Sequence, residues 1–112
     1  MTLDHATVDA HLASMPGWAR RDDAIVRRLT FPSFPDAMAF ATLLAFSAEA
    51  RDHHPDLLIS YRTVTVTWST HSAGGLTEKD LAGVAESDRI AAKLLRSDVV
   101  PAFEPGVDRL GD

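Results

Sequence analysis

The chain contains no cysteine, and this absence excludes several kinds of site at once. Disulfides, thiolate zinc sites, iron–sulfur clusters and cysteine nucleophiles all need that residue. Long apolar runs are also missing, because the longest candidate, residues 37–48, is shorter than the roughly 20 residues of a membrane-spanning helix. The N-terminus carries Asp4 and no apolar core, unlike a secretory signal peptide. We therefore expect a cytoplasmic protein with no membrane partner.

Basic residues are too few and too scattered to form a nucleic-acid-binding surface. The chain has 11 Lys and Arg against 16 Asp and Glu, which gives a formal net charge of −5. Such a field repels nucleic acid on average. With 112 residues, of which 46% are hydrophobic, the chain is long enough for one folded domain. We expect that domain over residues 1–96, followed by an extended or loosely attached tail over 97–112.

Helical patterns occur in three places along the chain. Asp4 can cap a helix over residues 4–15, and Ser33 can cap a longer one over 35–52. A third helix begins with the capping-box-like sequence 77–80. In the second helix we expect one apolar stripe facing the core, formed by Phe34, Met38, Ala41, Leu44, Ala45 and Ala48.

Strand patterns fill the segments between these helices. Residues 18–30 predict two short strands around an Asp22-Asp23 turn, and residues 57–61 and 64–70 predict two more around Arg62-Thr63. In the last strand, valines and Trp68 alternate with threonines, which is typical of a sheet covered on one side. The sequence thus predicts an α+β fold of order α-β-β-α-β-β-α, a four-stranded antiparallel sheet with three helices packed on one face. Its open face and edges favour self-association.

Three of the five histidines lie at predicted element ends, where catalytic groups are often mounted. His53 and His54 end the second helix, and His71 ends the last strand. Glu49 precedes His53 by one helical turn, and Asp80 follows His71 across a glycine turn. We expect these two carboxylate–imidazole pairs to exchange protons near neutral pH, as a dehydration requires of its acid and its base.

Other interpretations of these residues stay open at this point. Taken singly, each histidine can be a surface residue, Asp80 a helix cap, and Trp68 a core residue. A metal-dependent hydrolase is a further alternative, but neighbouring side chains project about 100° apart on a helix, so His53 and His54 are poorly placed to hold one ion. No H-E-x-x-H sequence is present. We therefore expect no metal and no cofactor.

The segment from Glu49 to Asp80 resembles the signature of the pterin-4a-carbinolamine dehydratases. The matching residues, at the family's spacing, are Glu49, His53-His54-Pro55, Tyr61, His71 and Asp80. The similarity extends over about residues 5–95. Many fixed positions at fixed gaps make the signature specific, although no part of it is specific alone.

This resemblance implies a lyase that dehydrates 4a-hydroxytetrahydropterin to quinonoid dihydropterin during tetrahydropterin recycling. By position, His53 and His71 are then the acid–base pair, and His54 binds the substrate and assists. Glu49 and Asp80 orient the imidazoles. All of these roles are implied by the resemblance alone.

The resemblance also implies ligands and partners. Asp52, Ser69 and Thr70 are expected to contact the pterin. Family members form homodimers or homotetramers and serve aromatic amino-acid hydroxylases, which make the substrate. An alternative function on the same fold is a dimerisation cofactor that binds another protein.

Overall fold

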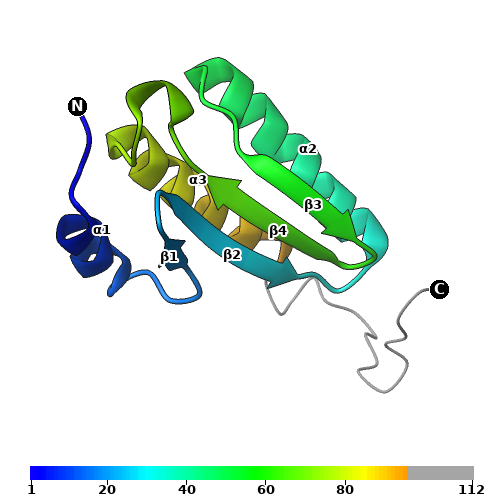
Figure 1. The fold of residues 1–112 in the computed structure, drawn as a ribbon. Coiled ribbons are helices and arrows are strands. Elements are labelled where there is room, and N and C mark those ends of the chain that lie inside the picture. Colours follow the sequence, from blue (N-terminus) through cyan, green and yellow to red (C-terminus); the bar gives the residue numbers. More distant parts are fainter. Residues whose placement is uncertain (96–112) are drawn as a thin grey trace.

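The structure of the protein is a computed structural model that describes residues 1–95 (Figure 1). The predicted tail, 97–112, and the predicted domain boundary at residue 96 lie outside the described residues. The elements follow the predicted order: α1 (His5–Leu12), β1 (Ala19–Arg21), β2 (Ala24–Thr30), α2 (Phe34–Arg51), β3 (Asp56–Ser60), β4 (Thr63–Trp68), a short 3₁₀ helix η1 (His71–Ala73) and α3 (Glu78–Leu94).

The four strands form one antiparallel sheet in the order β1-β2-β4-β3. Trp68 of β4 lies opposite Ile25 of β2, and Val66 lies opposite Leu57 of β3. Helices α2 and α3 cover one face of the sheet, and α1 lies beside β1 (Figure 1). The predicted α+β fold is confirmed.

The core lies between the covered face of the sheet and the two long helices. Val64, Val66 and Trp68 of β4 are buried, whereas the threonines between them are only partly buried on the open face. Helix α2 contributes Phe40 and Leu44 to the same core. The predicted alternation in β4 is therefore confirmed, and it determines which way Trp68 points.

The predicted caps fix where the helices begin. Asp4 Oδ1 accepts a hydrogen bond from the Thr7 backbone N–H at 2.7 Å, and Ser33 caps α2 by accepting one from the Asp36 N–H. At α3, Thr77 and Asp80 form a capping box. These side chains satisfy N–H groups that have no partner inside the helix.

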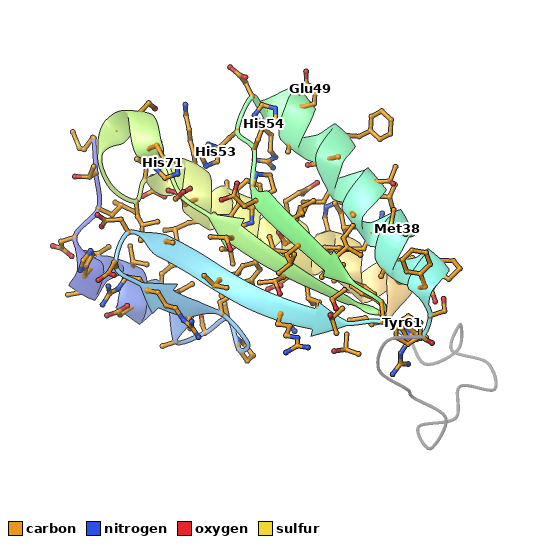
Figure 2. All side chains as sticks on the ribbon, turned by 45° about the vertical axis from the view of Figure 1, so that its right-hand side comes forward. Met38, Glu49, His53, His54, Tyr61 and His71 are labelled. Carbon is orange, nitrogen blue, oxygen red and sulfur yellow. The ribbon has the colours of Figure 1, made fainter. Side chains whose placement is uncertain are left out.

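The predicted apolar stripe of α2 is partly wrong. The buried side of the helix carries Ala37, Phe40, Ala41, Leu44 and Ala48. Phe34, Met38 and Ala45 are exposed instead, and Met38 is labelled on α2 in Figure 2. Apolar residues occur on both sides of this helix, so periodicity alone did not identify the core side. The exposed set Phe34, Met38, Leu43 and Phe46 is called the outer face of α2 below.

Small shifts separate the other predicted and observed boundaries. Helix α1 ends at Leu12, and β4 ends at Trp68. The turn between β3 and β4 is formed by Tyr61 and Arg62, with Tyr61 at φ 51°. Within residues 1–95, no helix has both the length and the hydropathy to cross a membrane.

Candidate active site

Three chain segments meet at one end of the sheet and bring the predicted site residues there (Figure 2). The end of α2 contributes Glu49, and the following residues are His53 and His54. His71 begins η1, just after β4. Asp80 lies in the first turn of α3.

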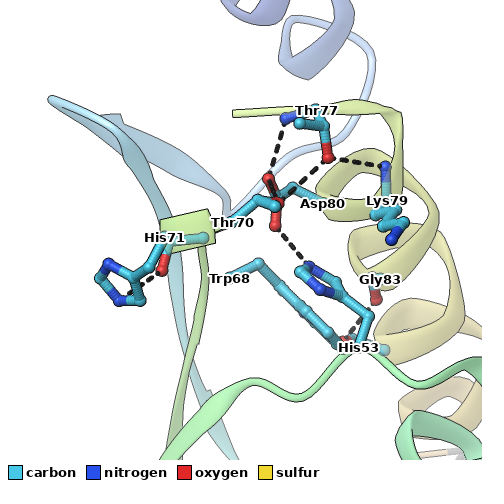
Figure 3. Close-up of polar contacts among 10 residues, drawn as sticks. His53, Trp68, Thr70, His71, Thr77, Lys79, Asp80 and Gly83 are labelled. Atoms are coloured by element: carbon cyan, nitrogen blue, oxygen red, sulfur yellow. Dashed lines mark hydrogen bonds and ion pairs between the residues drawn. The ribbon is translucent and has the colours of Figure 1, made fainter. Parts of the chain in front are cut away.

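His53 is held by Asp80. Its Nε2 atom lies 2.7 Å from Asp80 Oδ1, and the Asp80 side chain is completely buried. The backbone causes this pairing, because Asp52 takes the left-handed conformation (φ 54°, ψ 41°) and ends α2. The chain then leaves the helical path, and the His53 ring reaches α3 (Figure 3).

Asp80 is fixed in turn by two further donors. Its Oδ2 atom accepts hydrogen bonds from Thr70 Oγ1 at 2.6 Å and from the Thr77 backbone N–H at 2.9 Å. The hydroxyls of Thr70 and Thr77 lie 3.0 Å apart (Figure 3). One carboxylate therefore caps α3 and orients the histidine, so the start of the helix fixes the site geometry.

A small cavity adjoins the His53 ring. Its volume is about 220 Å³, and its lining residues are Arg51, His53, Trp68, Lys79, Ala82 and Gly83. Complete ligand pockets are commonly about 300–1,000 Å³, so a ligand here would extend beyond the cavity. The indole of Trp68 forms its apolar wall and stacks on His53, with ring centroids 5.4 Å apart.

The predicted pairing of Glu49 with His53 is wrong. Glu49 Oε1 instead lies 2.8 Å from His54 Nε2, and both side chains are more than half exposed. One-turn spacing would pair Glu49 with His53 only if the helix continued past residue 52. The turn at Asp52 redirects His53 and returns His54 to the carboxylate.

The predicted pairing of Asp80 with His71 is also wrong. The exposed His71 ring is directed away from Asp80, and its Nε2 lies 3.3 Å from Ser69 Oγ (Figure 3). Both carboxylate oxygens of Asp80 are already hydrogen-bonded: Oδ1 to His53, and Oδ2 to the Thr70 hydroxyl and to the backbone N–H at the helix cap. Among residues 1–95 no hydrogen bond connects His71 with His53. In Figure 3, Thr70 lies between the two rings.

Several residues at the site were missed by the sequence reasoning. Thr77 appeared there only as a helix cap, and neither Gly83 nor Ser87 was singled out. Gly83 carried a usable signal, because glycine in the middle of a helix often marks close packing. Thr70, predicted to contact substrate, has its hydroxyl occupied by Asp80 and Thr77.

The Glu86 carboxylate lies next to Arg51, one of the two basic residues that line the cavity. Hydrogen bonds from Arg89, reinforced by Ser47 and the charge of Arg51, lower the pKa of Glu86 to about 2. Glu86 Oε1 lies 3.9 Å from Arg51 and offsets part of its charge. In the part of the chain that the structure describes, no three His, Asp or Glu side chains are placed to hold a metal ion.

Comparison with known families identifies relatives over most of the chain. The family model described as pterin 4 alpha carbinolamine dehydratase matches residues 1–90. A protein of Roseiflexus castenholzii, provisionally named as such a dehydratase, is 46% identical over 88 residues, which is 79% of this chain and 95% of its own. A provisionally named dehydratase from Mycobacterium sp. (strain KMS) is 49% identical over 83 residues, which is 74% of this chain and 88% of its own.

Two solved structures share the fold. A transcriptional coactivator/pterin dehydratase from Brucella melitensis superposes with a TM-score of 0.77 at 33% identity, over 81% of this chain and 99% of the other. A pterin dehydratase-like protein identified as a RuBisCO assembly factor in the alpha-carboxysome gives a TM-score of 0.56 at 23% identity. That match covers 66% of this chain and 86% of the other, and it supports the fold alone.

Proposed function

The chain belongs to the pterin-4a-carbinolamine dehydratase family, and on this premise we propose that it dehydrates a 4a-hydroxytetrahydropterin to the quinonoid dihydropterin. The observation that carries the proposal is the buried Asp80 carboxylate bonded to His53 at the edge of a cavity. A histidine oriented in this way is suited to acid–base catalysis.

The proposed reaction breaks one C–O bond and one N–H bond. A protonated imidazole gives its proton to the 4a-hydroxyl, which leaves as water with the bonding electron pair. A second group takes the N5 proton, so that the N5–C4a double bond forms and charge balances. His53 and His71 take these two roles, and the exposed His54, bonded to Glu49, binds the substrate beside them.

Other parts of the proposal concern the ligand and its setting. Asp52 and Ser69 adjoin the histidines in sequence and are proposed to contact the pterin ring, whereas the Thr70 hydroxyl is bonded to Asp80. We place the reaction in the cytoplasm, after an aromatic amino-acid hydroxylase has made the 4a-hydroxypterin. The chemistry proposed here uses side chains alone, without metal or cofactor.

We also propose that copies of this chain associate. The outer face of α2 exposes four large apolar side chains, and Phe46 is 72% exposed. Strand β3 lies at the edge of the sheet, and its residue Leu58 is exposed. A homodimer or homotetramer would cover such a surface. The same face supports the second candidate function, binding of another protein, because it does not use the histidines.

The test of the catalytic proposal is a direct assay with 4a-hydroxytetrahydropterin. Chelator-treated wild-type protein should accelerate dehydration above the spontaneous rate, and His71→Ala should lose most of that acceleration, since an acid–base group contributes about 10²–10⁴-fold. Wild-type protein with no effect on the rate would reject the proposed activity. Full activity in His71→Ala would reject the role assigned to that residue.

A further inference from the structure

We propose that Trp68 is a positioning residue for this reaction, whose indole holds the His53 imidazole in the orientation that a proton donor needs. The catalytic part of this inference rests on the proposed function. Its structural part concerns only Trp68, His53 and α3, and can be tested without substrate.

The His53 ring is constrained from two directions. At its edge, Nε2 is bonded to Asp80, and at its face the ring stacks on the indole with an interplanar angle of 22°. Only 13% of the His53 side chain is exposed, and Trp68 is 1% exposed. An edge contact and a face contact together remove the ring's freedom to swing or to tilt.

The indole is itself fixed by α3. Trp68 Nε1 donates to Ser87 Oγ at 3.1 Å, and that hydroxyl donates to the Gly83 carbonyl at 2.8 Å. A Cβ added at Gly83 would lie 2.5 Å from two indole carbons, so only glycine allows this approach. Asp80, Gly83 and Ser87 recur at helical spacing, so one face of α3 positions both groups that hold His53.

The charges around His53 explain why an aromatic face helps. Arg51 of α2 and Lys79 of α3 line the same cavity and oppose a positive imidazolium. Asp80 favours the protonated ring, and Glu86 offsets part of the charge of Arg51. An indole face attracts a cation packed against it. The stacked indole and the bonded Asp80 carboxylate are therefore both favourable neighbours for a proton-donating imidazolium, and on this ground we assign His53 to the departing hydroxyl and His71 to the N5 proton.

The structural part can be followed by tryptophan fluorescence. The chain has two tryptophans, so Trp18→Phe leaves Trp68 as the only reporter. Because a protonated imidazole in contact with an indole quenches its emission, the emission should be lower at acid than at alkaline pH. His53→Gln in this background should abolish the change. His54→Gln, the matched control, should retain it. A titration that is absent, or that survives His53→Gln, would overturn the proposed contact.

The catalytic part requires steady-state kinetics of the dehydration. Trp68→Leu, shown to be folded by circular dichroism, should lower kcat more than it raises KM. Trp18→Phe, the control, should leave both constants unchanged. An unchanged kcat in Trp68→Leu would overturn the positioning role. If wild-type protein titrates by fluorescence as expected but has no dehydratase activity, the proposed function fails while the stacked pair stands.

Discussion

His53 and Asp80 are 27 positions apart in the sequence, yet His53 Nε2 lies 2.7 Å from Asp80 Oδ1. The bond joins the segment after α2 to the first turn of α3. Because the same carboxylate completes the capping box of α3, the orientation of the proposed proton donor depends on how that helix begins. Asp80 therefore links the start of α3 to the proposed catalysis.

Replacing Asp80 should cost stability as well as activity. Asp80→Ala leaves the Thr77 N–H, the Thr70 hydroxyl and the His53 ring without their acceptor, and each unsatisfied buried group costs about 1–3 kcal/mol. Urea unfolding should show a loss in that range or above it. The control, Glu49→Ala, removes an exposed pair worth less than about 1 kcal/mol. Equal losses of unfolding free energy in the two variants would contradict the claim that Asp80 stabilises the fold.

Gly83 and Trp68 should show strong coupling in a double-mutant cycle. Gly83→Ala forces the new Cβ against the indole and should destabilise the protein by about 1–3 kcal/mol, the usual cost of overpacking. In a Trp68→Leu background the obstruction is smaller, and alanine is the better helix former by about 1 kcal/mol, so the substitution should be neutral or stabilising. Thermal or urea unfolding of the four proteins measures the coupling. If the two substitutions change the unfolding free energy additively, Gly83 and the Trp68 indole are not in close contact.

Glu86 should make stability depend on pH in the acid range. Its pKa is lowered by Arg89, Ser47 and Arg51, so the folded state favours the ionised carboxylate. The stabilisation is fully present above the ordinary value of 4.5 and is lost as the pH falls toward about 2. Glu86→Gln should therefore show a shallower loss of unfolding free energy across this range than wild type. Parallel curves of unfolding free energy against pH for the two proteins would contradict the lowered pKa of Glu86.

The outer face of α2 should mediate self-association. Phe46→Glu places a charge in the middle of this exposed apolar set and should lower the molar mass measured by light scattering toward that of a single chain. Ala10→Glu adds the same charge on the exposed side of α1, and that variant should keep the wild-type mass. If wild type is already monomeric, or if both variants behave alike, this face is not the contact between copies.

Local sequence rules were sufficient for the elements and their caps. Ser33 and Thr77 each cap the helix that the sequence predicted, because a cap depends on residues within one turn. The alternation in β4 likewise identified Trp68 as inward-facing. These features need no knowledge of distant segments.

Pairings across the fold could not be predicted in this way. Glu49 and His53 have helical spacing, but the left-handed residue Asp52 lies between them and ends the helix. The partner of His53 comes from α3, which packs beside α2 only in the folded protein. The contact of Trp68 with Gly83 is equally non-local. Helical spacing and sequence proximity were therefore insufficient to predict the hydrogen-bond partners of His53 and His54.

The most direct test of the account compares dehydration of 4a-hydroxytetrahydropterin by His53→Ala and by His11→Ala. His53 is proposed as the proton donor held by Asp80, whereas His11 lies exposed on α1. We predict a rate loss of about 10²–10⁴-fold in His53→Ala and a wild-type rate in His11→Ala. A folded His53→Ala protein that keeps the wild-type rate would contradict the central claim.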